Sequence, residues 1–312
     1  MGGCPSHPLV PPHAKGRVGD QGIDIVNRDG NRLLHGPGEY AQVRAFEQQG
    51  VQRLPVRHGG RGCPDLRAHG VRVHDGRGPF QNGLPENREI LQNQLPEAIV
   101  ETYDPEELSL EEGKLFLEKQ CRWADVIVLG PGLGREPYVC DLVEQILADA
   151  FVPIVLDADG LNTVASHPYL TRYFTENIII TPHMGEMARL CSCSVEQLKE
   201  DPVQAARSYS SRYGVVCVMK DAATVTADKD GNVWLNPSGC SAMAKAGSGD
   251  VLTGVIAGLL ARGLECTDAA FLGVYVHGLA GEEAARRWGI HSVLAGNLAD
   301  CILCHREMRS MT

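Results

Sequence analysis

Short apolar runs alternate with longer amphipathic stretches from about residue 84 to the C-terminus. Four apolar runs rich in β-branched residues end in glycine or polar side chains, at Val126–Gly130, Pro153–Asp159, Asn177–His183 and Gly214–Lys220. Continuous apolar runs of this length are typical of parallel strands covered on both faces. Helical stretches lie between them, including Glu136–Phe151 and Ser194–Tyr213. The alternation predicts strand–helix–strand units with right-handed crossovers.

The pattern changes after the fourth run. Two alternating segments, Thr224–Asp228 and Val233–Asn236, flank a Lys-Asp-Gly sequence, which is a hairpin signal. Three helices are predicted after them, at roughly 249–262, 268–288 and 292–309. We therefore predict an α/β fold with a doubly wound, mostly parallel central sheet and helices on both faces. Ligands of such sheets bind beyond the carboxyl ends of the strands.

The first 83 residues differ from this pattern. They contain 16 of the 35 glycines, 6 of the 11 histidines and ten arginines, but a single lysine, Lys15. Apolar positions show poor periodicity, so the segment cannot easily bury enough surface to offset its chain entropy. We predict that residues 1–83 are atypical and poorly ordered, and that residues 84–312 form the catalytic domain.

Composition excludes several classes of protein. The chain of 312 residues carries a net charge of -10, which disfavours nucleic-acid binding because an acidic surface repels phosphate backbones. It contains no apolar run long enough for a transmembrane helix, and its first residues lack the apolar core of a signal peptide. The 11 cysteines are scattered singly, which is typical of reduced thiols in a cytoplasmic protein.

The strongest candidate site lies where the sequence Ala-Gly-Ser-Gly-Asp, residues 246–250, opens an apolar helix. Small residues at Gly247, Ser248 and Gly249 allow the backbone to approach a phosphate, and the helix start supplies free N–H groups. These three residues are the candidate anion hole. Asp250 is either a helix cap or a base that accepts the proton of a substrate hydroxyl as that oxygen attacks a phosphoryl group.

A second glycine-rich motif, Gly-Pro-Gly-Leu-Gly at residues 130–134, directly follows a predicted strand. It has neither the spacing of a dinucleotide fingerprint nor the lysine of a P-loop. A plain turn is the alternative, but we expect Gly132 and Gly134 to let the backbone approach a ligand closely.

Two more strand ends carry polar residues. Thr-Pro-His-Met-Gly-Glu, residues 181–186, predicts a ligand contact at His183, whereas Glu186 could hold magnesium-bound water or cap the next helix. Asp157, Asp159 and Asn162 follow the preceding strand, and their spacing does not indicate a tight metal cage. These positions predict a polar cleft.

The fourth motif joins two strands at residues 220–224. A lysine and a threonine across a turn can flank the phosphate or ribose of a nucleotide, and a surface turn is the alternative. The candidate nucleotide contacts are Lys220, Asp221, Ala222, Ala223 and Thr224.

Taken in this order, the motifs resemble those of the ADP-dependent (S)-NAD(P)H-hydrate dehydratases, a branch of the ribokinase-like fold. The resemblance runs from about Pro85 to the C-terminus and rests on the motifs GPGLG, DADGLN, TPHxGE, KxxxT and GSGDVLTG. Jointly these motifs are specific, whereas each alone would be weak.

The resemblance implies repair of hydrated NADH or NADPH: a nucleotide phosphorylates the ring hydroxyl, and phosphate then leaves. ADP, or ATP, would be the phosphoryl donor with Mg²⁺. Asp250 would activate the hydroxyl, and Gly132, Gly134 and His183 would contact the hydrate. Lys220 to Thr224 and Gly249 would contact the adenine nucleotide. A homo-oligomer, often a tetramer in this family, is also implied.

Two departures from the family pattern accompany the resemblance. Many members have Asn, Gly and Thr where this chain has Cys240, Ala242 and Lys245, which would alter nucleotide contacts slightly. The family's first strand, hydrate-contacting segment and apolar helix have no counterpart in residues 1–83, whose composition is that of a shifted reading frame. Two alternatives therefore stay open, a ribokinase-like kinase of a small hydroxylated metabolite and a nucleotide-binding protein without turnover.

Overall fold

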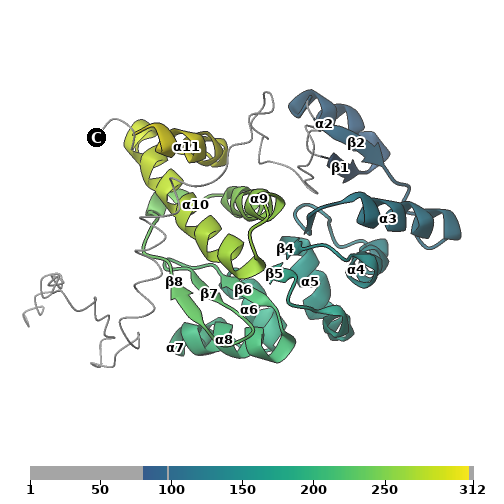
Figure 1. Cartoon of the computed structure of the whole chain (residues 1–312), viewed down its shortest axis with the longest axis horizontal. Helices are drawn as coiled ribbons and strands as arrows, with labels where there is room; N and C mark the ends of the chain where they lie inside the picture. The colour runs from purple at the N-terminus through teal and green to yellow at the C-terminus, as the bar shows by residue number, and fades with distance from the viewer. Residues whose placement is uncertain (1–79, 97, 309–312) are drawn as a thin grey trace, which may run out of the picture. The chain divides into compact units, whose positions relative to one another are not determined.

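The computed structural model describes residues 80–96 and 98–308, all of them within the second of the two units into which the chain divides, Gly59–Thr312 (Figure 1). The prediction for residues 1–79 therefore lies outside the described residues. The last four residues of the predicted atypical segment, Phe80–Gly83, form strand β1, which pairs in parallel with β2 (Ile99–Thr102). Between and after them lie the 3₁₀ helix η1 (Pro85–Asn87), α2 (Arg88–Gln94) and α3 (Glu111–Trp123).

Six strands of the described residues form one sheet in the order β3-β4-β5-β6-β7-β8. Their bounds are β3 Ile127–Leu129, β4 Ile154–Leu156, β5 Ile178–Ile180, β6 Val216–Met219, β7 Val225–Ala227 and β8 Val233–Leu235. The pairs from β3 to β6 are parallel, and β7 and β8 are antiparallel additions. The predicted mostly parallel sheet and the predicted hairpin are confirmed.

Helices cover both faces of this sheet because every second strand residue points to each face. Ile154 and Leu156 of β4 pack against one helical layer, whereas Val155 between them packs against the other. The first layer contains α4 Pro137–Asp149, α5 Ala158–Ser166, η2 Pro168–Tyr173, α6 Met184–Cys191, α7 Val195–Glu200 and α8 Pro202–Tyr213. The second layer contains α9 (Ser248–Ala261) and α10 (Cys266–Trp288) (Figure 1).

Two further elements complete the second layer. The 3₁₀ helix η3 (Ser241–Met243) and α11 (Ala295–Met308) contribute apolar side chains to a cluster with α9 and α10. None of the described helices combines the length and the apolar character that a bilayer crossing requires.

One predicted helix is divided in the structure. The stretch 194–213 forms α7 and α8, which are separated at Asp201. Pro202 occupies the first position of α8, where its missing N–H costs nothing, and the Asp201 side chain accepts a hydrogen bond from Gln204 N at 2.9 Å. A single helix is therefore wrong here, because Pro202 has no N–H to continue the hydrogen bonding of α7.

Candidate functional site

The carboxyl ends of β3, β4, β5 and β6 bring the sequence motifs together. Lys220, one residue after β6, forms a parallel bridge with His183, and its N–H donates to Pro182 O at 2.8 Å. Gly134 N, in the loop after β3, donates to Asp159 Oδ2 at 3.0 Å. Because parallel strands place their carboxyl ends at one edge, four motifs spread over about a hundred residues meet there, as predicted.

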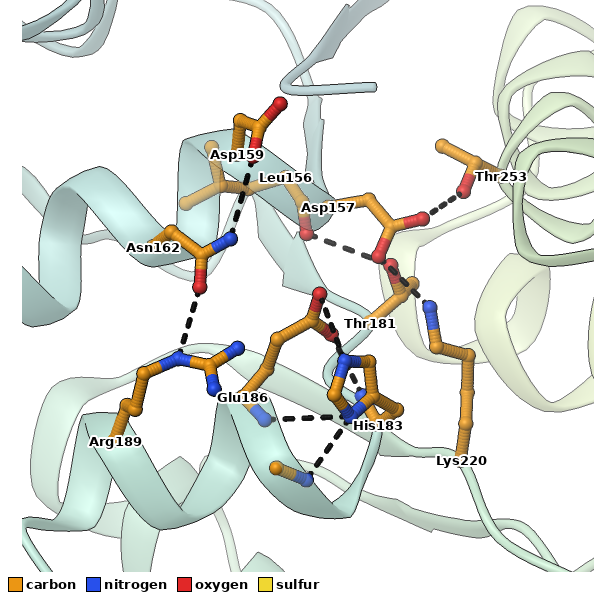
Figure 2. A network of polar contacts seen from close by, with 11 residues as sticks. Leu156, Asp157, Asp159, Asn162, Thr181, His183, Glu186, Arg189, Lys220 and Thr253 are labelled. Atoms are coloured by element: carbon orange, nitrogen blue, oxygen red, sulfur yellow. Dashed lines mark hydrogen bonds and ion pairs between the residues drawn. The ribbon is translucent and has the colours of Figure 1, made fainter. Parts of the chain in front are cut away.

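Asp157 is the centre of a buried polar network at this edge (Figure 2). Its side chain is 2% exposed, and Oδ1 accepts a hydrogen bond from Lys220 Nζ at 2.8 Å. Its other oxygen, Oδ2, accepts from Thr253 Oγ1 at 2.9 Å, and Thr253 is fully buried on α9. The carboxylate is therefore neutralised and satisfied by groups from two other elements.

The candidate anion hole forms the start of α9. Gly247 is the N-cap residue with φ of 83°, a left-handed conformation that glycine adopts without a Cβ penalty. A Cβ atom at Gly249 would lie 3.3 Å from Lys220 Nζ, so the ammonium rests against the first helical turn. Positive charge and free helical N–H groups thus lie side by side, which is the chemistry that binds phosphate.

Asp250 is not the cap of this helix. Gly247 is the N-cap, and Asp250 is the third residue of α9. The Asp250 side chain is exposed and makes no hydrogen bond or ion pair with another described residue. Asp250 thus makes no capping hydrogen bond, although its place in the first turn still lets it interact with the positive end of the helix, and its carboxylate is open to solvent.

His183 and Glu186 form a capping box at the start of α6. His183 Nδ1 accepts hydrogen bonds from Gly185 N at 2.9 Å and Glu186 N at 3.4 Å, while Glu186 Oε2 accepts from His183 N at 2.8 Å (Figure 2). Burial raises the pKa of Glu186 above its usual range. The structure thus realises the capping alternative for Glu186. His183 keeps more than half of its side chain exposed, with Nε2 3.3 Å from Glu186 Oε1.

The three glycines of the loop after β3 differ in their surroundings. Gly130 has φ of 126°, and a Cβ atom there would lie 1.8 Å from Asp157 O. Gly132 and Gly134 also have positive φ, of 70° and 78°, but both are exposed, and a Cβ on Gly134 would meet nothing within 4 Å. Gly130 is therefore required by the β4 backbone, whereas Gly132 and Gly134 face open space.

The predicted nucleotide contacts in the turn after β6 differ in their exposure to solvent. Asp221, Ala222 and Ala223 are exposed, whereas Thr224 is half-buried and its carbonyl accepts from Asn236 N at 3.0 Å. Lys220 is half-buried beside Asp157. The turn thus offers backbone groups to solvent beside a fixed lysine.

An apolar cavity of about 280 Å³ borders the glycine loop on the side away from Lys220. Its wall includes residues 130–133, Tyr103, Tyr138 and apolar side chains of α3 and α4 such as Leu117 and Leu142. Within the described residues β3 pairs only with β4, and β1 pairs only with β2, so each has one edge without a strand partner. Among the described residues, the site is therefore bordered on this side by a cavity and by strand edges without a partner.

The family model described as NAD(P)H-hydrate dehydratase matches residues 82–303, which is most of the chain. The chain belongs to this family. The match covers every element from β3 to α10 and all five motifs of the resemblance.

Relatives of known name agree with this membership. The chain is 35% identical over 212 residues to the ADP-dependent (S)-NAD(P)H-hydrate dehydratase of Neisseria meningitidis, covering 67% of this chain and 70% of the relative. It is 47% identical over 179 residues to the bifunctional NAD(P)H-hydrate repair enzyme of Moorella thermoacetica, covering 56% of this chain. That stretch spans 33% of the Moorella protein, so the chain corresponds to about a third of such bifunctional relatives.

A solved structure with the same fold is the ADP/ATP-dependent NAD(P)H-hydrate dehydratase from Bacillus subtilis co-crystallized with ATP and Mg²⁺ and soaked with CoA. It aligns with a TM-score of 0.62 and 27% identity, covering 78% of this chain and 84% of the other. A ribokinase-like superfamily protein from Enterococcus faecalis aligns equally well, with a TM-score of 0.62 and 25% identity over 73% of this chain and 76% of that one. The ribokinase-like fold is therefore confirmed.

Two buried polar residues of this family member escaped the sequence reasoning. Thr253 contacts Asp157, and His277 of α10 is buried beside the backbone of Ser248, with Nε2 lacking a hydrogen-bond partner among the described residues. Burial lowers the pKa of His277 to about 4, and the nearby Lys220 acts in the same direction, so the imidazole is neutral at neutral pH. A single polar residue within the apolar helices VLTGVIAG and VYVHGLAG was the signal that could have revealed both.

The described residues do not supply a metal cage. They contain no group of three or more His, Cys, Asp and Glu side chains that could hold an ion. Asp157 is paired with Lys220, and Glu186 caps α6. The described residues therefore offer no all-protein cage, which magnesium bound together with nucleotide phosphates does not require.

Proposed function

We propose that the chain dehydrates (S)-NAD(P)H hydrate in an ADP-dependent reaction and so restores NAD(P)H. The observation that carries the proposal is the exposed, unpaired Asp250 carboxylate at the first turn of α9, in a chain of this family. The candidate anion hole belongs to the same turn, and a Cβ atom at Gly249 would lie 3.3 Å from Lys220 Nζ, which comes from the end of β6. A base, a cation and free helical N–H groups are what phosphoryl transfer to a hydroxyl needs.

The reaction has two steps in this proposal. Asp250 accepts the proton of the ring hydroxyl as its oxygen attacks the terminal phosphoryl group of ADP, which leaves as AMP. The C–O bond to phosphate then breaks, the neighbouring ring carbon loses a proton, and the electron pair of that C–H bond forms the ring double bond again as inorganic phosphate leaves. Gly247, Ser248 and Gly249 would hold the charge on the transferring phosphoryl group.

The remaining site residues bind the two substrates. Lys220, Gly249 and the exposed backbone of Asp221–Ala223, together with Thr224, would contact the adenine nucleotide. Gly132, Gly134 and His183 would contact the hydrate. The exposure of Gly132, Gly134 and His183 at one sheet edge supports this assignment.

Magnesium is expected to enter with the nucleotide, where it neutralises phosphate charge, because the described residues offer it no cage. We further propose a cytoplasmic location. We also propose a homo-oligomer, whose mass light scattering after size exclusion would measure. Turnover rates measured with ADP and with ATP, and with each of the two hydrates, would show which phosphoryl donor and which hydrate the protein prefers.

The test is recovery of NADH absorbance from purified NADH hydrate with ADP and Mg²⁺, compared between the wild type and Asp250→Asn. Asn retains the shape of the side chain but cannot accept a proton, and removal of a positioned general base lowers the rate by about 10²–10⁴-fold. We expect that loss in kcat, with ADP affinity and melting temperature almost unchanged.

A variant that keeps more than about a tenth of the wild-type kcat would remove Asp250 from the catalytic role. A phosphorylated product that never returns to NADH would instead support a kinase of a hydroxylated metabolite. ADP binding with no product of either kind would support a binding protein.

A further inference from the structure

A chain of three buried or half-buried side chains connects the sheet to the anion-hole helix. Lys220 lies 63 residues from Asp157 in sequence, and Thr253 lies 96 residues from it, yet both contact its carboxylate at 2.8 and 2.9 Å. Asp157 is 2% exposed and Thr253 is 0% exposed. Figure 2 shows Lys220 and Thr253 each contacting a different oxygen of the carboxylate.

The Thr253 hydroxyl fixes the orientation of this carboxylate. Thr253 Oγ1 lies 2.9 Å from Asp157 Oδ2 and also 2.9 Å from Gly249 O, but it has one proton to donate. A hydrogen bond to an ionised acceptor is the stronger one, so the proton belongs on the bond to Asp157. Oδ2 is thereby occupied, and Oδ1 is left for the lysine.

The lysine gains a defined position from this arrangement. A Cβ atom at Gly249 would lie 3.3 Å from Lys220 Nζ and 3.7 Å from Asp157 Oδ2. The ammonium is therefore held against the first turn of α9. A free lysine side chain would spread over many rotamers, and fixing it at the moment of binding would cost conformational entropy.

We propose that Asp157 and Thr253 are positioning residues, which hold the Lys220 ammonium at the first turn of α9 before a nucleotide phosphate arrives. Neither residue needs to touch the substrate, and both act through the lysine. This inference rests on the proposed function in one respect, that the phosphates of an adenine nucleotide bind at this turn.

Thr253→Val is the sharpest variant because it retains shape and leaves both charges in place, whereas a change at Asp157 would also alter the charge of the site. We expect it to raise the Kd of ADP, measured by calorimetry with Mg²⁺, by about three- to tenfold, since a hydrogen bond to a charged group is lost. The Kd of adenosine, which has no phosphate, should stay unchanged.

Two control variants accompany it. Thr253→Ser restores the hydroxyl and should bring the Kd of ADP back to within about twofold of the wild type. Ser210→Ala removes another fully buried hydroxyl, which donates to Ala227 O at 2.9 Å on the other face of the sheet. It should lower the melting temperature without changing the ratio of the two dissociation constants.

The reactivity of the lysine gives an independent readout. Acylation rates followed by mass spectrometry should differ at Lys220 between Thr253→Val and the wild type, because the Asp157 carboxylate that holds the ammonium is no longer oriented by Thr253. The rate at the exposed Lys229 of the β7–β8 turn serves as the internal reference and should not change.

Three results would overturn the proposal. One is an equal rise in the dissociation constants of ADP and adenosine, which indicates general loss of structure. Another is weaker ADP binding with an unchanged acylation rate at Lys220. The third is a wild-type protein that binds ADP no better than adenosine. Recovery of NADH from its hydrate is measured separately, so failure here is distinct from failure of the dehydratase function.

Discussion

The two sides of the candidate site differ in how they are held. On the nucleotide side, formed by Asp157, Lys220, Thr253 and residues 247–250, buried polar groups satisfy one another across β4, β6 and α9. On the glycine-loop side, formed by residues 130–134, the loop borders an apolar cavity of about 280 Å³. Buried contacts therefore hold the proposed nucleotide side in place, whereas the glycine loop borders unfilled space.

The attachment of the glycine loop to β4 at Gly130 is tested first. Gly130→Ala places a Cβ 1.8 Å from Asp157 O at a φ of 126°, so we expect a loss of at least about 3 kcal/mol in the free energy of unfolding. Gly134→Ala is the matched control, since its φ is 78° but nothing lies within 4 Å, and we expect a loss of about 1 kcal/mol.

Urea denaturation of the two variants measures this difference. Equal losses would show that the loop is not anchored on β4 at Gly130. A large loss at Gly134 would show that this part of the loop is more closely packed than its open surroundings indicate.

The buried His277 should make the free energy of unfolding depend on pH. Its pKa falls from 6.5 in the unfolded chain to about 4 in the folded protein, so the unfolded state binds the proton between these values. Stability contributed by neutral His277 is therefore complete above about pH 6.5 and is lost as pH falls toward 4, by up to about 3 kcal/mol.

The measurement is the free energy of unfolding at several pH values from 4.5 to 7.5, in the wild type and in His277→Gln. The free energy of unfolding should depend less steeply on pH in the variant, because the proton that His277 takes up on unfolding is absent. Identical slopes would show that His277 takes up its proton at the same pH in both states.

Lys220→Ala tests the phosphate contact itself. Loss of a charge-assisted contact should weaken ADP binding by about tenfold or more. The melting temperature should also fall, because Asp157 would be left as an unpaired buried charge. The ratio of ADP to adenosine affinity separates the two effects, and an unchanged ratio would remove Lys220 from the nucleotide site.

The smallest expected effect lies in the cavity. Cys121 of α3 lines it and is buried, so Cys121→Leu should fill part of the space and stabilise the fold by about 1 kcal/mol. ADP affinity should not change. A destabilised variant would mean that the space is already filled, since overpacking costs about 1–3 kcal/mol.

Much of the fold was predictable because buried strands carry a local signal. The runs at 126–130, 153–159, 177–183 and 214–220 each contain the strand that the structure places there. Strand β1 was not predicted, since Phe80–Gly83 has no β-branched residue and is defined by its pairing with β2. A short polar strand that forms only by pairing with another segment shows no alternation of apolar and polar residues from which it could be predicted.

The placement of the candidate site residues was predictable where they follow strands. The segments 130–134, 181–186 and 220–224 follow β3, β5 and β6, and the order of elements brings those ends to one edge of the sheet. Residues 246–250 instead open α9, and contact with Lys220 brings them to the same edge. The partners of Asp157 were not predictable, because Thr253 and Lys220 reach it from α9 and β6 through tertiary packing alone.

The central claim is that this site couples consumption of ADP to restoration of NAD(P)H, even with unfilled space beside the glycine loop. The direct measurement is ³¹P NMR together with absorbance on one sample of NADH hydrate, ADP, Mg²⁺ and the full chain. The account predicts that AMP, inorganic phosphate and NADH appear in equal amounts. Bound ADP that yields no AMP, or a stable phosphorylated product without NADH, would contradict it.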